Sequence, residues 1–118
     1  MKIGIFIPMT DWLGNISPIA KRAEALGFES IWVPEHVFIP VHTASPYGGT
    51  PDGKIPETML HTVNPFIALS SASAATSTIK LGTGGCLVQQ HHVLDLASQV
   101  ATLDMYSKGR FLFGVGSG

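Results

Sequence analysis

Two short apolar segments with a helical pattern between them constrain the fold of this chain most strongly. Residues 2–8 and 30–34 are almost continuously apolar and closed by proline, which is typical of strands covered on both faces. Between them, Ser17 and Pro18 predict the N-cap and first position of a helix, and Gly27 predicts its end. This order predicts a βαβ unit with parallel strands.

The alternation continues along the chain. Asn64 and Pro65 predict the start of a helix that runs to about residue 75, and a third strand is expected at residues 79–82. A further helix is expected over about residues 93–106, and a fourth strand over residues 110–114. These units imply an α/β fold, either an open doubly wound sheet or the first four units of a (β/α)8 barrel of TIM-barrel type. The inward face of the last helix is expected to carry Leu94, Ala97, Val100, Ala101 and Leu103.

Charge and composition narrow the class of protein. Seven Lys and Arg against eight Asp and Glu give a net charge of -1 without a basic stripe, which argues against nucleic-acid binding. The apolar stretches are far shorter than the ~20 residues of a membrane span, and the amino terminus lacks a signal pattern. With a single cysteine, the chain is expected in the reducing cytoplasm. Only 13% of the residues are charged, so we expect much of the chain to be covered by further structure, as in a piece of a larger fold.

In parallel α/β folds, catalytic and ligand-binding residues lie at the carboxyl ends of the strands. Those ends fall here at residues 8–11, at Glu35 and His36, at residues 83–86 and at residues 116–118. His36 is a candidate for proton transfer beside a cofactor, because imidazole titrates near neutrality; a packed histidine satisfied by the backbone is the equal alternative. Adjacent strand residues point to opposite faces, so only one of Glu35 and His36 is expected to be catalytic.

The glycine clusters, Cys86, Trp32 and the remaining histidines are considered as further binding or catalytic sites. Residues 82–85 suit either the close approach of a flat ligand or a tight turn. Residues 114–118 differ from the dinucleotide-binding fingerprint in the place of the third glycine. Cys86 is expected to pack in an apolar strand rather than act as a nucleophile, and Trp32 is expected in the core. The histidines lack metal-ligand spacing, so no metal site is expected.

Residues 38–63 interrupt the alternation of strands and helices. Proline and glycine recur throughout this segment, so it is expected as a long loop. Loops of this length in compact domains are functional lids or disordered segments.

The order of these segments resembles the bacterial luciferase-like monooxygenase superfamily, and especially its F420-dependent oxidoreductases. The resemblance implies an eight-stranded (β/α) barrel, of which residues 1–118 form the amino-terminal half with an inserted loop at about residues 38–63. It covers essentially the whole chain and rests on motifs in the family's order, the last two being the most specific. They are IGIFIP at 3–8, AEALGFESIWVPEH at 23–36, ATSTIKLGTG at 75–84, LASQVATLD at 96–104 and GRFLFGVGSG at 109–118.

The same resemblance implies how the deazaflavin ring is contacted. His36 matches the family histidine beside the ring, a proposed acid in reduction or a ring contact. Glu35 matches a cofactor-contacting position that is more often aspartate. Gly84 and Gly85 fall where relatives often have a non-prolyl cis peptide that backs the ring.

The resemblance implies two further cofactor contacts, and the sequence differs from the family pattern at one place. Ser117 and Gly118 match the fourth-strand residues that touch the cofactor. Residues 90–93 read QHHV, where relatives often carry Arg-His-Pro or Arg-Asn-Pro, so an arginine and a proline that help to shape the pocket floor are missing.

We therefore expect an oxidoreductase that transfers hydride between coenzyme F420 and a small organic substrate, with His36 assisting proton movement. Residues 52–54 resemble an inserted segment of one F420-type subgroup, which favours the deazaflavin over flavin mononucleotide (FMN). A monooxygenase that uses reduced FMN and O₂ is the close alternative. From another class, the chain is a truncated, catalytically inactive half-barrel that is stable only by dimerisation. We expect a homodimer, and neither nucleic acid nor membrane as a partner.

Overall fold

A parallel sheet of four strands forms the centre of the computed structural model, which describes residues 1–117. In spatial order its strands are β1 (Gly4–Phe6), β2 (Ser30–Val33), β3 (Lys80–Thr83) and β5 (Phe111–Leu112). The order in space follows the order in the sequence, and each neighbouring pair is parallel. All the expected strands are confirmed, with small shifts at their ends.

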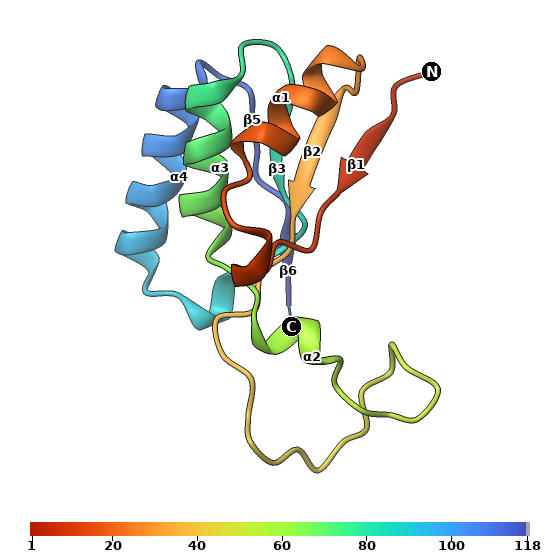
Figure 1. Ribbon diagram of the computed structural model, residues 1–118. Helices are drawn as coiled ribbons and strands as arrows, with labels where there is room; N and C mark the ends of the chain where they lie inside the picture. The colour runs from red at the N-terminus through yellow and green to blue at the C-terminus, as the bar shows by residue number, and fades with distance from the viewer. Residues whose placement is uncertain (118) are drawn as a thin grey trace.

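Three helices lie together on one face of this sheet: α1 (Ser17–Ala25), α3 (Pro65–Ala75) and α4 (Val93–Ser107) (Figure 1). Their buried side chains form one apolar cluster with Ile31 of β2 and Leu81 of β3. In a doubly wound sheet, helices cover both faces and the strand order reverses. The described chain differs from that arrangement, because its strands are in sequential order and these three helices lie on one face.

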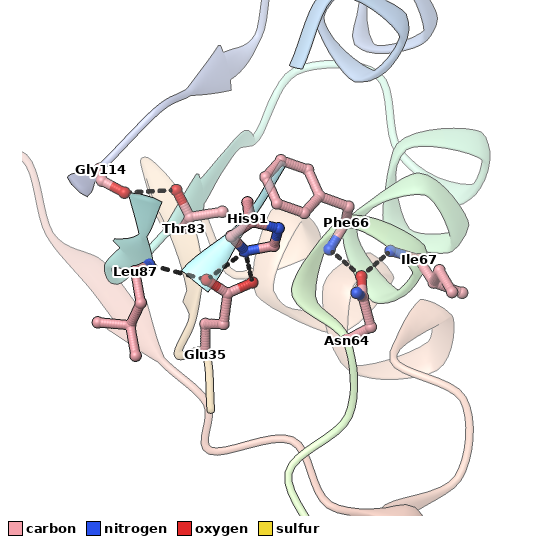
Figure 2. Close-up of polar contacts among 8 residues, drawn as sticks. All are labelled: Glu35, Asn64, Phe66, Ile67, Thr83, Leu87, His91 and Gly114. Atoms are coloured by element: carbon pink, nitrogen blue, oxygen red, sulfur yellow. Dashed lines mark hydrogen bonds and ion pairs between the residues drawn. The ribbon is translucent and has the colours of Figure 1, made fainter. Parts of the chain in front are cut away.

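The helix starts follow the sequence signals closely. The Asn64 side chain accepts hydrogen bonds from the backbone N–H groups of Phe66 at 3.0 Å and Ile67 at 3.2 Å, as an N-cap should (Figure 2). Ser17 was expected to be the N-cap of α1, but the N-cap is Ile16 and Ser17 is the first residue of the helix. The Ser17 hydroxyl instead lies 3.0 Å from the carbonyl oxygen of Ser71, so it joins α1 to α3.

The buried face of α4 agrees with the expected one only in part, because Leu103 is buried as predicted but other expected residues are not. Leu96, Leu103 and Ser107 are buried, whereas Leu94, Ala97 and Ala101 are exposed. Val100 is half-buried. Apolar side chains lie on both sides of this helix, so periodicity alone does not select the side that packs against α3.

Within the described residues, no helix has both the length and the apolar character needed to span a bilayer.

Trp32 lies on the face of the sheet that the helices leave open. It is half-buried rather than enclosed in the core, because the buried neighbours Ile31 and Val33 point to the helices and Trp32 points the other way. Its indole N–H donates to the Ser30 hydroxyl at 2.9 Å. A Cβ at Gly82 would overlap the Trp32 ring, so glycine on the neighbouring strand lets the indole lie across the sheet.

A second, two-stranded parallel sheet continues beyond the first. β4 (Cys86–Leu87) pairs with β6 (Val115–Gly116), just after the glycines that follow β3 and β5. The sequence did not predict these strands, since two residues carry no periodicity. The short helical segments were also not predicted: η1 (Asp11–Leu13), α2 (Glu57–Leu60) and η2 (Val88–Gln90). Apart from α2, the expected loop at residues 38–63 has no helix or strand, and it extends from the end of the sheet where β2 stops (Figure 1).

Glu24 of α1 fixes the connection between α3 and β3. Its Oε1 atom accepts hydrogen bonds from the backbone N–H groups of Ser77, Thr78 and Ile79 and from the Thr78 hydroxyl, at 2.6–2.9 Å. Partial burial alone would raise the pKa of Glu24, but these four donors outweigh it and lower the pKa to about 2. The charged carboxylate therefore stabilises the fold.

Glu24→Gln is expected to lower the free energy of unfolding by about 1–2 kcal/mol at pH 7, because solvent screens this partly exposed carboxylate. The folded-state pKa lies below the ordinary 4.5, so the contribution is complete above about pH 5 and is lost as the pH falls toward 2. Urea unfolding of wild type and variant across this range measures the difference. Glu57→Gln, at an exposed acid, is the control; a difference that does not change with pH would contradict the assignment.

Candidate active site

A cavity of about 420 Å³ opens at the carboxyl ends of β1, β2 and β3. It brings together four of the residues that the sequence singled out: Glu35, His36, Gly84 and Gly85. Its other walls are apolar or carry hydroxyl groups. They are formed by Phe6, Pro8, Pro34, Tyr47, Thr58, Met59, Thr62 and Leu87.

His36 lines this cavity and, together with Glu35 and Thr62, also lines a second one. It follows β2 directly, is half-buried, and also lines a neighbouring cavity of about 300 Å³. Its position beyond the last buried residue of β2 is the one that the sequence predicts for a proton-transfer group. The geometry therefore leaves His36 able to meet a ligand at the end of the sheet.

Gly84 and Gly85 form a bare backbone wall of the cavity. The peptide bond between them is cis, as the family resemblance implied. The Gly84 N–H donates to the Val33 carbonyl at 2.8 Å, which ties this turn to β2. A Cβ at Gly84 would lie 3.1 Å from the Phe6 ring, and one at Gly85 would lie 3.1 Å from the carbonyl carbon of Val115. Side chains other than hydrogen would crowd this wall.

Glu35 directs its carboxylate into the protein (Figure 2). Its Oε2 atom accepts a hydrogen bond from the Leu87 N–H at 2.8 Å, and His91 Nε2 lies 3.0 Å from each carboxylate oxygen. The Glu35 side chain is only 2% exposed. Both Glu35 and His36 line the two cavities, but the Glu35 carboxylate also joins β2 to the segment after the glycine turn.

Cys86 lies beside Glu35 and His91. Burial, and then the neighbouring Glu35 carboxylate, raise the pKa of the Cys86 thiol to about 12, so this thiol is protonated and is no nucleophile at neutral pH. One donor atom from each of these three side chains lies within 4.8 Å of the others, and these donor types bind metal ions. The histidine spacing that the sequence analysis tested could not find this cluster, because its members come from three separate segments.

Of the two carboxyl-terminal residues of the expected site, Ser117 and Gly118, the structure describes only Ser117. Ser117 is exposed and follows β6, and it is not among the described residues that line the larger cavity. Gly118 lies outside the described residues. Sequence reasoning did not single out Tyr47, Thr58, Met59 and Thr62 as cavity residues, although the long loop directly after β2 was a signal that its side chains could reach the end of the sheet.

Comparison with known proteins gives consistent matches along the chain. A family model described as luciferase-like monooxygenase matches residues 1–118. The uncharacterized protein Rv0953c of Mycobacterium tuberculosis is 41% identical over 100 residues, which are 84% of this chain and 36% of that protein. The 4-hydroxyprotoasukamycin monooxygenase of Streptomyces nodosus subsp. asukaensis is 32% identical over 100 residues, 85% of this chain and 22% of that protein.

A solved structure agrees with the observed fold. The coenzyme F420-dependent tetrahydromethanopterin reductase from Methanopyrus kandleri superposes with a TM-score of 0.69 at 29% identity, over 99% of this chain and 27% of that one. The chain spans 36% and 22% of the lengths of the two curated relatives.

Proposed function

The chain belongs to the luciferase-like monooxygenase family, and we propose that it forms the first four βα units of an eight-stranded (β/α) barrel. The sequential strand order and the helices on one face support this architecture. In such a barrel, β1 and β5 at the two edges of the sheet would pair with further strands, and the open face that carries Trp32 would line the interior.

We propose that the cavity at the carboxyl ends of the strands binds the ring system of coenzyme F420. The residues present fit such a group, because apolar walls, a single imidazole and a bare glycine backbone suit a flat ring. The cavity volume of about 420 Å³ lies within the ~300–1,000 Å³ of small-molecule sites. When bound, the deazaflavin supplies hydride transfer to or from an organic substrate.

Each residue of the site has a proposed role. His36 assists proton movement, passing a proton to the substrate or taking one from it as the substrate is reduced or oxidised. Gly84 and Gly85 let the ring approach the backbone closely. For Ser117 and Gly118, a cofactor contact is proposed on the family resemblance alone.

Glu35 is proposed to act as a positioning residue. It lines the cavity, but its carboxylate holds the Leu87 N–H and His91. Leu87 follows the glycine turn by two residues, so this contact fixes the wall against which the ring would lie.

The choice between F420 and FMN rests on two observations. The F420-dependent reductase from Methanopyrus kandleri is 29% identical over this chain, and residues 52–54 resemble an F420-type insertion. The 32% identity to a monooxygenase supports the alternative, in which reduced FMN and O₂ oxygenate the substrate.

Titration of the chain with oxidised F420, and separately with FMN, tests the proposal through the absorbance of the ring. F420 is expected to bind more tightly. His36→Ala is expected to raise the F420 dissociation constant roughly tenfold, the loss of about 1.4 kcal/mol of contact, whereas His42→Ala at an exposed loop position is expected to have no effect. If neither cofactor perturbs the absorbance, the proposed function is wrong; if only FMN binds, the monooxygenase alternative is correct.

A homodimer is proposed on the evidence of exposed apolar side chains. Leu94 and Met105 of α4 are 71% and 65% exposed, and Ile67 of α3 is 74% exposed. A second copy of the chain would cover them. The catalytically inactive half-barrel would instead dimerise through the exposed sheet edges β1 and β5, and the cofactor titration separates it from the enzyme.

A further inference from the structure

Glu35, Cys86 and His91 bring three different metal-binding atoms together inside the described chain. A carboxylate oxygen, a thiol sulfur and an imidazole nitrogen all lie within 4.8 Å of one another. Cys86 has no exposed surface, and the side chains of Glu35 and His91 are 2% and 11% exposed. We infer that these three side chains form a binding site for a soft divalent transition-metal ion, and that Zn²⁺ is the ion whose ligand preferences they match.

The spacing of the donor atoms is close to that of a zinc site. Tetrahedral Zn²⁺, with bonds of about 2.0–2.3 Å, separates its ligand atoms by roughly 3.3–3.6 Å. His91 Nε2 lies 3.0 Å from each oxygen of Glu35, and no pair of donors in the cluster exceeds 4.8 Å. The largest separation therefore exceeds the tetrahedral spacing by at most roughly 1.2–1.5 Å, which is the distance that side-chain rotation has to close on binding.

The surroundings support the ligands and leave room for a fourth. The Leu87 N–H donates to Glu35 Oε2 at 2.8 Å, the kind of outer-shell contact that orients a metal-bound carboxylate. Glu35 and His91 both line the cavity of about 300 Å³. The amide side chains of Asn64 and Gln99 line it too, so a water molecule can enter and complete the coordination.

Charge balance favours a divalent ion over an isolated thiolate at this place. A thiolate from Cys86, a carboxylate from Glu35 and a neutral imidazole from His91 carry two negative charges, which Zn²⁺ cancels. Binding displaces the thiol proton of Cys86 to solvent, together with any second proton on the His91 ring. A neutral, fully coordinated cluster removes the cost of burying an unpaired charge.

Binding of Zn²⁺ is tested with Zn²⁺ and Co²⁺ salts on the chain without any organic cofactor. One equivalent of Zn²⁺ is expected to be taken from a chromophoric chelator, and Co²⁺ is expected to give the charge-transfer absorption of a thiolate ligand. Cys86→Ser and His91→Gln are each expected to weaken Zn²⁺ binding by more than the roughly 10–100-fold that loss of an outer-shell partner costs. His42→Gln, at an exposed histidine, is the control and should bind as wild type does.

The inference is wrong if no stoichiometric Zn²⁺ is bound, or if the Co²⁺ spectrum lacks the thiolate band. It is also wrong if folded Cys86→Ser and His91→Gln bind as wild type does, since exposed histidines would then be the ligands. Should Cys86→Ser fail to fold, the Co²⁺ spectrum of the wild type and the affinity of His91→Gln decide. F420 and FMN take no part in the measurement, so its outcome is independent of the proposed function.

Discussion

Gly114→Ala is expected to lower the free energy of unfolding by about 3 kcal/mol or more. A Cβ at this position would overlap the carbonyl oxygen of Thr83 and lie 3.3 Å from its carbonyl carbon, and both atoms belong to the backbone of β3. No side-chain rotation relieves such an overlap. Gly114 also cannot move away, because its carbonyl oxygen accepts hydrogen bonds from the Cys86 N–H at 2.7 Å and the Thr83 hydroxyl at 2.8 Å.

Gly116→Ala is the matched control in the same glycine-rich segment. A Cβ there would meet Leu87 Cδ2 at 3.6 Å, an ordinary van der Waals contact, so a change within about 0.5 kcal/mol is expected. Urea unfolding followed by far-UV circular dichroism measures both variants. Equal midpoints would mean that β3 and the segment after β5 do not pack as closely as observed.

The central sheet could be predicted because each of its strands has a recognisable pattern of neighbouring residues in the sequence. The apolar run at residues 30–34 and the cap at Asn64 and Pro65 need no distant partner to be recognised, and the structure has the corresponding elements at Ser30–Val33 and Pro65–Ala75. The two-residue strands β4 and β6 could not be recognised in this way. They exist because the glycines before them allow two chain segments to approach, and that approach is a property of the whole fold.

The partly wrong prediction of the buried face of α4 has a physical cause, since Leu103 is buried as predicted whereas Leu94, Ala97 and Ala101 are exposed. Leu94, Ala97 and Ala101 repeat at helical spacing as regularly as the buried Leu96 and Leu103 do. Periodicity shows that a helix has an apolar side, but a helix with apolar side chains on two sides needs its neighbours to decide which one packs.

In the candidate site, the residues that directly follow a strand could be predicted, whereas partners that are distant in sequence could not. Glu35 and His36 were singled out because they follow a buried strand. The partners of Glu35 were not found. Leu87 and His91 lie 52 and 56 residues away in sequence, and only the pairing of β2 with β3 brings them to it.

Arg110→Ala is expected to lower the free energy of unfolding by about 3–4 kcal/mol. The Arg110 guanidinium donates hydrogen bonds of 2.8–3.1 Å to the carbonyl oxygens of Ser73, Thr76, Ile79 and Ser107 and to the Thr76 hydroxyl. The carbonyls of Ser73, Thr76 and Ser107 lie at the carboxyl ends of α3 and α4, where a helix has no donors of its own and a positive charge is favourable, and that of Ile79 directly precedes β3. Alanine would leave part-buried carbonyl groups without partners.

Arg110→Lys separates charge from geometry, because lysine keeps the positive charge but lacks the planar fork that reaches several carbonyls at once. It is expected to recover about half of the loss or less. Arg22→Ala, at an exposed position of α1 where the arginine side chain has no hydrogen-bond partner among residues 1–117, is the control and should change stability by less than about 0.5 kcal/mol. Thermal and urea unfolding of the three variants rank them. A lysine variant as stable as wild type would show that charge near the helix ends, and not the network of hydrogen bonds, accounts for the contribution of Arg110.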